Sequence, residues 1–207
     1  MDYLVGLDPS FTRTGICIID LNSKEIFFET ASCKIGEKIF ENVYKAAKDI
    51  ARQISDIVYK RCSDNFDMIS ESPLPCSSMS PALYALDTLI YDTFESHFKI
   101  TYNPATLRSK IHGHKYEKKE SQELAYKYIN ILSKSGYILK SDIGIKKKIT
   151  HDNAEAFLYC HLYLKDSGHP EFQFDNSEEI ARYKQRKLEL KKKEKELLKN
   201  QKLYTVK

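Results

Sequence analysis

The sequence predicts a mixed α/β fold in which helices cover one sheet. The chain opens with three short apolar stretches joined by polar turns, and strands then alternate with helices. Hydrophobic residues make up 42% of its 207 residues, an ordinary value for a globular protein. A chain of this length forms one compact domain with an appendage and is too short for two substantial domains.

Strands are expected first over residues 2–8, 15–20 and 24–30. Polar turns separate them, so consecutive strands should pair as hairpins. Residues 36–61 should form an amphipathic helix, because their apolar positions recur at intervals of three and four. A fourth strand, FDMIS, follows this helix and ends at Glu71.

The second half of the chain continues the alternation. Ser80 should cap a helix that has a proline in its first turn, and FKITY should form the fifth strand. A basic, glycine-punctuated segment over 103–122 leads into a helix that becomes periodic at Leu124, and another helix covers 151–164. We therefore expect a mixed five-stranded sheet with helices on both faces.

Charge divides the chain near its end. Residues 182–207 contain eleven Lys or Arg and three Glu, a net charge of +8, which leaves −4 for residues 1–181. We expect a folded domain over 1–175 and a basic helical extension over 176–207. Such an extension either contacts a polyanion or is a solvated helix, and composition alone does not separate the two.

Composition also excludes several classes of protein. No apolar run approaches the roughly 18 residues of a membrane-spanning helix, and the N-terminus enters strand-like sequence without a basic leader. We therefore expect a cytoplasmic protein without a membrane partner. Five scattered cysteines without a CxxC pair indicate reduced thiols. Lys outnumbers Arg by 27 to 6, which is typical of the AT-rich genomes of phages and low-GC bacteria.

Four carboxylates are placed where they can meet. Asp8 and Glu71 end two predicted strands and lie side by side if those strands are neighbours. Asp152 and Glu155, three residues apart at a helix start, share one face of that helix. Taken singly, they are explained as a turn former, a solvated strand end and partners of the helix dipole. As a set, they predict a hard-cation site for Mg²⁺ or Mn²⁺.

Two such ions would activate a water molecule and stabilise the leaving oxygen of a phosphodiester. A group of basic residues precedes the last two acids: Arg108, Lys110, Lys115, Lys118 and Lys119. These cations would neutralise the phosphates that an acidic site repels, and a solvated loop is the simpler interpretation.

Four motifs follow one another between Tyr3 and Leu164: GLDPSFTRTG, ISESP, YNPATLRSKIHGHKYEKKESQ and HDNAEAFLYCHL. In order and spacing they resemble the RuvC-type Holliday junction resolvases of the RNase H-like superfamily. The resemblance implies an RNase H-like fold and catalytic metal ligands at Asp8, Glu71, Asp152 and Glu155. It also implies two Mg²⁺ ions per site, replaceable by Mn²⁺, and a homodimer that cuts four-way DNA junctions symmetrically.

The chain departs from the family pattern at several positions. Glu155 stands where the family usually has Asp, and Leu74 stands where an aromatic residue often enters the junction centre. Leu74 is therefore a candidate apolar wedge that would not stack on a base. The glycine loop of the basic segment is reduced to Gly113-His114-Lys115. The charged helix after Ser177 has no counterpart in the pattern, and we expect it to add DNA contacts.

Three other functions use some of the same features. A nuclease of RNA:DNA hybrids would use the same four acids and differ in its contacts to the 2′-hydroxyl groups. A non-catalytic adaptor for branched DNA would rely on the basic helix. An ATPase of the actin and Hsp70 type also has a Gly-x-Asp hairpin, but it needs a second, duplicated domain that 207 residues do not hold.

Overall fold

The structure is a computed structural model that describes residues 1–33, 43–73, 80–107, 110–111, 118–140 and 149–175, together with 177, 180–181, 185 and 188–189. The strands are β1 (Tyr3–Asp8), β2 (Thr14–Asp20), β3 (Glu25–Ala31), β4 (Phe66–Glu71), β5 (Phe98–Tyr102) and β6 (Ile138–Lys140). The helices are α1 (Val43–Arg61), α2 (Ser80–Phe94), α3 (Pro104–Leu107), α4 (Lys118–Lys134) and α5 (His151–Asp166), with short 3₁₀ turns η2 (Glu95–His97) and η4 (Pro170–Phe172).

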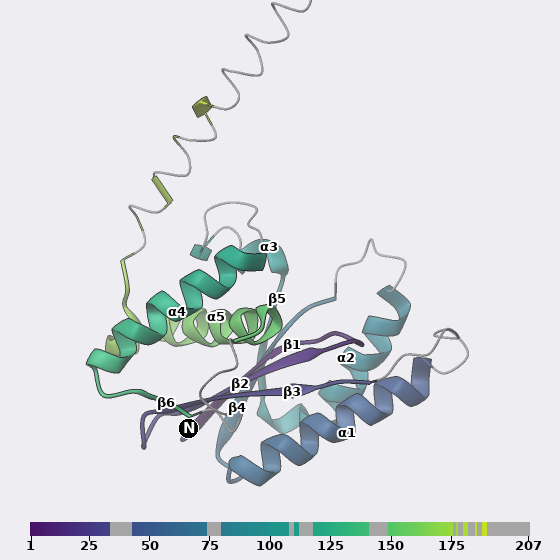
Figure 1. Ribbon diagram of the computed structural model, residues 1–207. Coiled ribbons are helices and arrows are strands. Elements are labelled where there is room, and N and C mark those ends of the chain that lie inside the picture. The colour runs from purple at the N-terminus through teal and green to yellow at the C-terminus, as the bar shows by residue number, and fades with distance from the viewer. Residues whose placement is uncertain are drawn as a thin grey trace, which may run out of the picture.

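The strands form one mixed sheet in the order β5-β4-β1-β2-β3-β6 (Figure 1). The first three strands pair antiparallel as consecutive hairpins, whereas β4 is parallel to β1 and β5 is parallel to β4. This arrangement confirms the predicted α/β class and places β1 and β4, which carry two of the four candidate acids, side by side.

The sheet has one strand more than the sequence predicts. β6 contains three residues, all exposed, which is too few for an alternating pattern to be visible in the sequence. It pairs parallel with β3, where Ile138 is opposite Glu25, and Lys140 forms a 3.1 Å ion pair with Glu25. Tertiary pairing rather than local hydrophobicity therefore makes this segment a strand.

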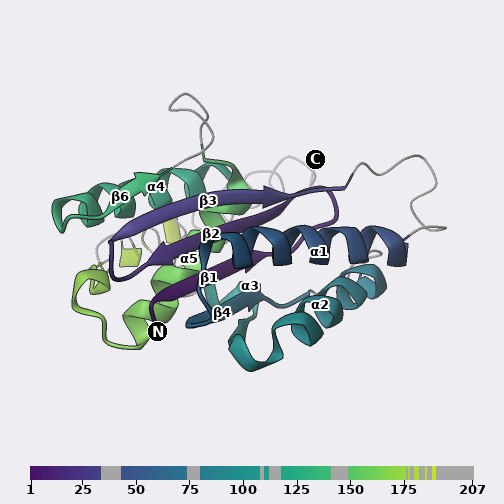
Figure 2. The same ribbon diagram turned by 90° about the horizontal axis from the view of Figure 1, so that it is seen from below.

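Two helices, α1 and α2, cover one face of the sheet (Figure 2). The apolar stripe of α1 is buried against it: Ala47, Ile50, Ala51, Ile54 and Val58. The predicted start of this helix at residue 36 lies outside the described residues. On α2, Leu86, Ile90 and Phe94 pack into the same core.

The opposite face is covered by α5, with α4 packed against it (Figure 1). Eleven of the sixteen residues of α5 are buried, as expected for a helix held between a sheet and another helix. α4 begins at Lys118, earlier than the apolar periodicity that becomes visible at Leu124. Its first residues are exposed and charged, so they do not contribute to that periodicity. Gly6 of β1 lets α5 lie close to the sheet, since a β-carbon there would overlap the carbonyl oxygen of Ala156.

The chain after α5 turns back over the same layer. Phe172 and Phe174 pack with Tyr128 of α4 and His161 of α5. Most of the predicted extension over 176–207 lies outside the described residues. Within the described part of the chain, no helix combines the length and the apolar character needed to cross a membrane.

Candidate metal centre

Asp8 and Glu71 are the last residues of two neighbouring parallel strands. Leu7 is opposite Ser70 in the register between β1 and β4, so the two acids that follow stand next to each other at the same edge of the sheet. Each backbone is fixed by strand pairing, which leaves only side-chain torsions to be set. The sequence predicted this juxtaposition on the condition that the strands were neighbours, and they are.

The start of α5 supplies a third carboxylate. Thr150 caps the helix by accepting a 3.1 Å hydrogen bond from the backbone N–H of Asn153. The buried side-chain amide of Asn153 donates to the carbonyl oxygens of Ile16 and Glu29, which ties the first turn to β2 and β3. Glu155 is therefore held over the sheet edge with 8% of its surface exposed.

Asp8, Glu71 and Glu155 form a compact cluster, which we call the acid cluster. One carboxylate oxygen from each lies within 4.8 Å of the other two. Asp152, one turn before Glu155, stands at the margin of the cluster. Its carboxylate is 3.9 Å from the guanidinium of Arg13, and its charge contributes to the potential at Asp8.

The electrostatics of the acid cluster fit a cation. Burial, followed by the negative charges of Glu71, Glu155 and Asp152, raises the pKa of Asp8 well above its ordinary value. The ammonium group of Lys118 acts in the opposite direction. Carboxylate oxygens are the ligands that Mg²⁺ and Mn²⁺ prefer, and a divalent cation would relieve the repulsion that raises this pKa. The residues present therefore fit such an ion.

Hydroxyl groups that the sequence did not single out orient two of these acids. Tyr159 donates a 2.6 Å hydrogen bond to Oε2 of Glu71, and Ser121 of α4 donates a 3.2 Å bond to Oε1 of Glu155. His151 Nε2 is 3.5 Å from the same Oε1 atom. Tyr159 lies four residues after Glu155, so the helical period could have placed it on the same face, whereas nothing local connects Ser121 to the site.

The basic residues predicted to contact DNA are not all equivalent. Among the described ones, Lys118 begins α4 and is the one whose charge lowers the pKa of Asp8. Lys119 forms a 3.3 Å ion pair with Glu123. Lys110 is 2.7 Å from Asp166, the last residue of α5. Asp166 is about 16 Å along the helix axis from Glu155, so Lys110 is paired far from the acid cluster. Leu74, Arg108 and Lys115 lie outside the described residues.

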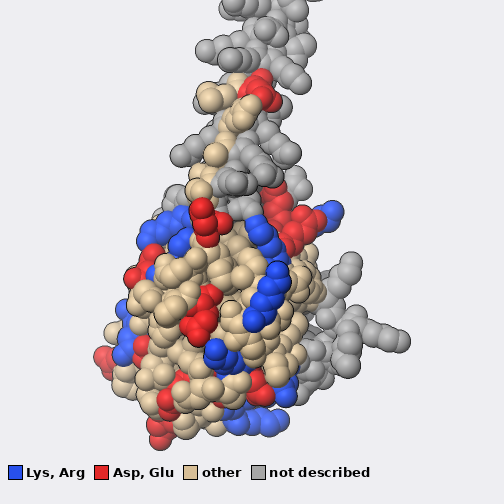
Figure 3. All heavy atoms as spheres, turned by 90° about the vertical axis from the view of Figure 1, so that its left-hand side faces the viewer, with Lys and Arg blue, Asp and Glu red and all other residues tan. Residues whose placement is uncertain are grey.

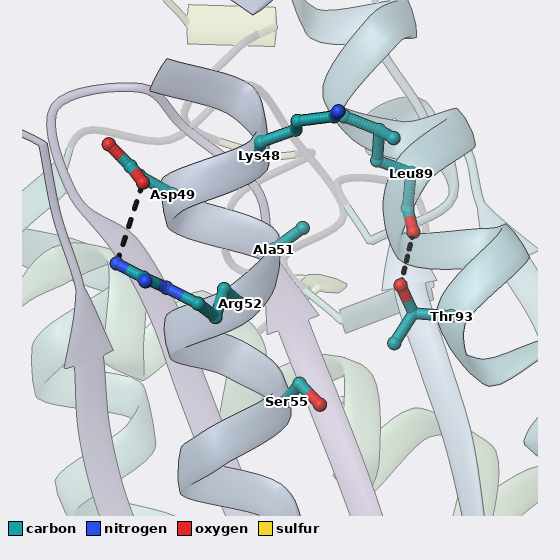
Figure 4. A pocket seen from close by; sticks show the side chains of 7 residues that line it. All are labelled: Lys48, Asp49, Ala51, Arg52, Ser55, Leu89 and Thr93. Carbon is teal, nitrogen blue, oxygen red and sulfur yellow. Dashed lines mark hydrogen bonds and ion pairs between the residues drawn. The ribbon is translucent and has the colours of Figure 1, made fainter. Parts of the chain in front are cut away.

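Two other surfaces differ from the acid cluster in chemistry. A groove between α1 and α2 contains one carboxylate, Asp49, which is paired with Arg52 (Figure 4). At the end of the molecule where β1 begins, acidic side chains are interspersed with basic ones (Figure 3). Among the residues that the structure describes, neither surface gathers carboxylates for a metal, and the second does not present charge of a single sign to a nucleic acid.

No protein-family model matches the sequence, and no curated protein matches it. Solved structures that are similar in fold include two of RuvC. One is T. thermophilus RuvC in complex with a Holliday junction substrate, with 12% identity and a TM-score of 0.52 over 81% of this chain and 97% of that chain. The other is a Thermus thermophilus RuvC structure, with 13% identity and a TM-score of 0.53 over 80% and 96% of the two chains. This chain therefore has an RNase H-like fold similar to that of RuvC.

Proposed function

We propose that this protein is a metal-dependent endonuclease that cleaves branched DNA, chiefly four-way junctions, by symmetric phosphodiester hydrolysis. The observation that carries the proposal is the acid cluster, in which β1, β4 and α5 bring three carboxylates within 4.8 Å of one another. The similarity in fold to a RuvC structure solved with a Holliday junction supports branched DNA as the substrate class.

The four acids would act together as metal ligands in this reaction, and one lysine would contact the DNA. Asp8, Glu71 and Glu155, with Asp152 at the margin, would hold the divalent ions. When bound, two Mg²⁺ ions would supply an activated water and stabilisation of the leaving oxygen, and Mn²⁺ would substitute for them. Lys118 would contact a phosphate beside the scissile bond, because it is the described candidate whose charge acts on the cluster.

A two-fold dimer would match the two equivalent strands of a four-way junction. We place its seam on α2, where Tyr84 and Tyr91 are seven residues apart on one face of the helix and are 45% and 47% exposed. Tyr91→Glu should then shift the sedimentation coefficient from that of a dimer to that of a monomer. An unchanged coefficient would place the seam elsewhere.

The activity is tested with a synthetic immobile four-way junction in Mg²⁺, using duplex DNA and an RNA:DNA hybrid as comparison substrates. Paired symmetric nicks on the junction are expected, and they should be lost in Glu155→Gln and Asp152→Asn while junction binding is retained. Preferential cutting of the hybrid would instead indicate a hybrid nuclease. Tight junction binding without cutting in Mg²⁺ or Mn²⁺ would indicate a DNA-binding adaptor.

A further inference from the structure

Two tyrosines of α5 hydrogen-bond to two acids of β4. Tyr159 donates to Oε2 of Glu71 at 2.6 Å, and Tyr163, one helical turn later, donates to Oδ2 of Asp67 at 3.3 Å. Asp67 and Glu71 are four residues apart on the strand, so both face α5. The helix therefore makes the same kind of contact twice, once inside the acid cluster and once outside it.

The ring of Tyr159 has little freedom to move. It is fully buried and stacks on Tyr102 of β5, with ring centroids 5.8 Å apart and planes inclined by 14°. From this fixed ring the hydroxyl group donates its hydrogen bond to Glu71. The position of the donor is thus set by packing, and the carboxylate must adapt to it.

Glu71 needs such a constraint. Its carboxylate stands within 4.8 Å of those of Asp8 and Glu155, and repulsion between like charges favours its rotation away from them. A hydrogen bond from a fixed donor opposes that rotation and stabilises the ionised carboxylate. Partners of this kind orient metal-binding side chains in other proteins, and their loss typically weakens metal affinity about 10–100-fold.

We propose that Tyr159 is a positioning residue of the metal centre, which holds the carboxylate of Glu71 beside Asp8 and Glu155 before the metal binds. This role rests on the proposed metal-binding function of the acid cluster. Tyr163 makes the corresponding bond to Asp67, whose carboxylate is also 3.3 Å from Lys99 and is not part of the cluster.

The test compares Tyr159→Phe with Tyr163→Phe in the full-length chain. Each variant removes one hydroxyl from the same face of α5, and Phe at residue 159 keeps the ring that stacks on Tyr102. Isothermal titration calorimetry with Mn²⁺ alone should show about 10–100-fold weaker binding for Tyr159→Phe. Binding by Tyr163→Phe should stay within about twofold of the wild type, because Asp67 does not belong to the cluster.

A double-variant cycle separates positioning from general loss of structure. In a Glu71→Gln background, Tyr159→Phe should cause no further loss of Mn²⁺ affinity, since the carboxylate that the Tyr159 hydroxyl orients is already absent. Equal Mn²⁺ affinity of the wild type and Tyr159→Phe, or an equal loss in Tyr163→Phe, would overturn the positioning role alone. A wild-type chain that binds no Mn²⁺ would overturn the metal site itself and this role with it.

Discussion

Gly15 of β2 lies directly against the backbone of Asp152 at the start of α5. A β-carbon at residue 15 would overlap the carbonyl group of Asp152 and approach the backbone nitrogen of Asn153 to 2.6 Å. The glycine in the Thr-Gly pair of the first sequence motif therefore has a steric role. It lets the first turn of α5 rest on the sheet, and that turn is followed directly by Glu155 of the acid cluster.

Gly15→Ala is expected to displace the start of α5 and to cost about 1–3 kcal/mol of unfolding free energy, as overpacking against backbone atoms does. Mn²⁺ affinity should fall as well, because Glu155 moves with the helix. Urea unfolding and calorimetry measure the two effects. Ile54→Val, which costs about 0.5–1.5 kcal/mol in the core under α1, is the control that should leave metal affinity unchanged. Wild-type Mn²⁺ affinity in Gly15→Ala would contradict this account.

The sequence was sufficient to predict the elements whose signals are local. The strands ending at Asp8 and Glu71 alternate or are continuously apolar, and the helix that carries Glu155 was expected over 151–164, close to its bounds of His151–Asp166 in the structure. The parallel pairing of β1 with β4 then brings the two strand-end acids together. The residues alone left this strand order as a condition, and the resemblance of the motifs to a known family implied the fold that contains it.

Features that depend on distant partners could not be read in the same way. β6 is a strand because β3 offers it an edge, and its three residues have no pattern of their own. Ser121 reaches Glu155 across 34 residues of sequence, and Arg13, from the turn between β1 and β2, meets Asp152 at the start of α5. Local propensity and periodicity contain no information on such contacts.

Asp8→Asn is expected to stabilise the metal-free protein at neutral pH. Burial, followed by the neighbouring carboxylates, raises the folded-state pKa of Asp8. The contribution of its protonated form to the stability of the fold is therefore complete below the unfolded pKa of about 3.9. That contribution is lost as pH rises through the folded pKa. At pH 7 this raised pKa therefore lowers the free energy of unfolding of the wild type. Asparagine removes the charge of this carboxylate.

The midpoint of thermal unfolding reports this effect, at about 2–4 °C for each kcal/mol in a domain of this size. Without metal, Asp8→Asn should melt above the wild type at pH 7, and the gain should shrink towards pH 4. Saturating Mn²⁺ should stabilise the wild type but not the variant. Asp67→Asn is the control, because its carboxylate is paired with Lys99 and its loss should give no gain. A lower midpoint for metal-free Asp8→Asn at pH 7 would show that burial and repulsion of the Asp8 carboxylate do not dominate the effect of this substitution.

Lys118→Ala should weaken junction binding, whereas Lys119→Ala should change it little. The two residues are adjacent on α4, but the charge of Lys118 acts on Asp8 and that of Lys119 is 3.3 Å from Glu123. Loss of one phosphate contact lowers the slope of log affinity against log salt concentration by about 0.9. Fluorescence anisotropy at several salt concentrations measures affinity and slope together. Equal slopes for both variants would remove the special position of Lys118.

His161 is a buried histidine between α5 and the aromatic residues that follow it. It has no exposed surface, its ring stacks on Phe174 at 5.0 Å and 17°, and neither ring nitrogen has a hydrogen-bond partner within the described part of the chain. Burial, with a smaller contribution from Lys165, lowers the pKa of His161 to about 3. The folded protein therefore holds this ring in its neutral form at all but strongly acid pH.

His161→Phe should make the protein more resistant to acid. The unfolded chain takes up a proton on this histidine below its ordinary pKa of about 6.5, and the folded chain does so only near 3, so wild-type stability falls as pH drops through that interval. The difference in unfolding free energy between variant and wild type should grow by about 1.4 kcal/mol for each pH unit below 6.5. Urea unfolding at pH 7.5, 6.5, 5.5 and 4.5 measures it. Phe174→Leu is the control, because it alters the same ring cluster without removing a titrating group, so its effect on the unfolding free energy should not vary with pH. A pH-independent difference for His161→Phe would show that the His161 ring is protonated in the folded state as readily as in the unfolded one.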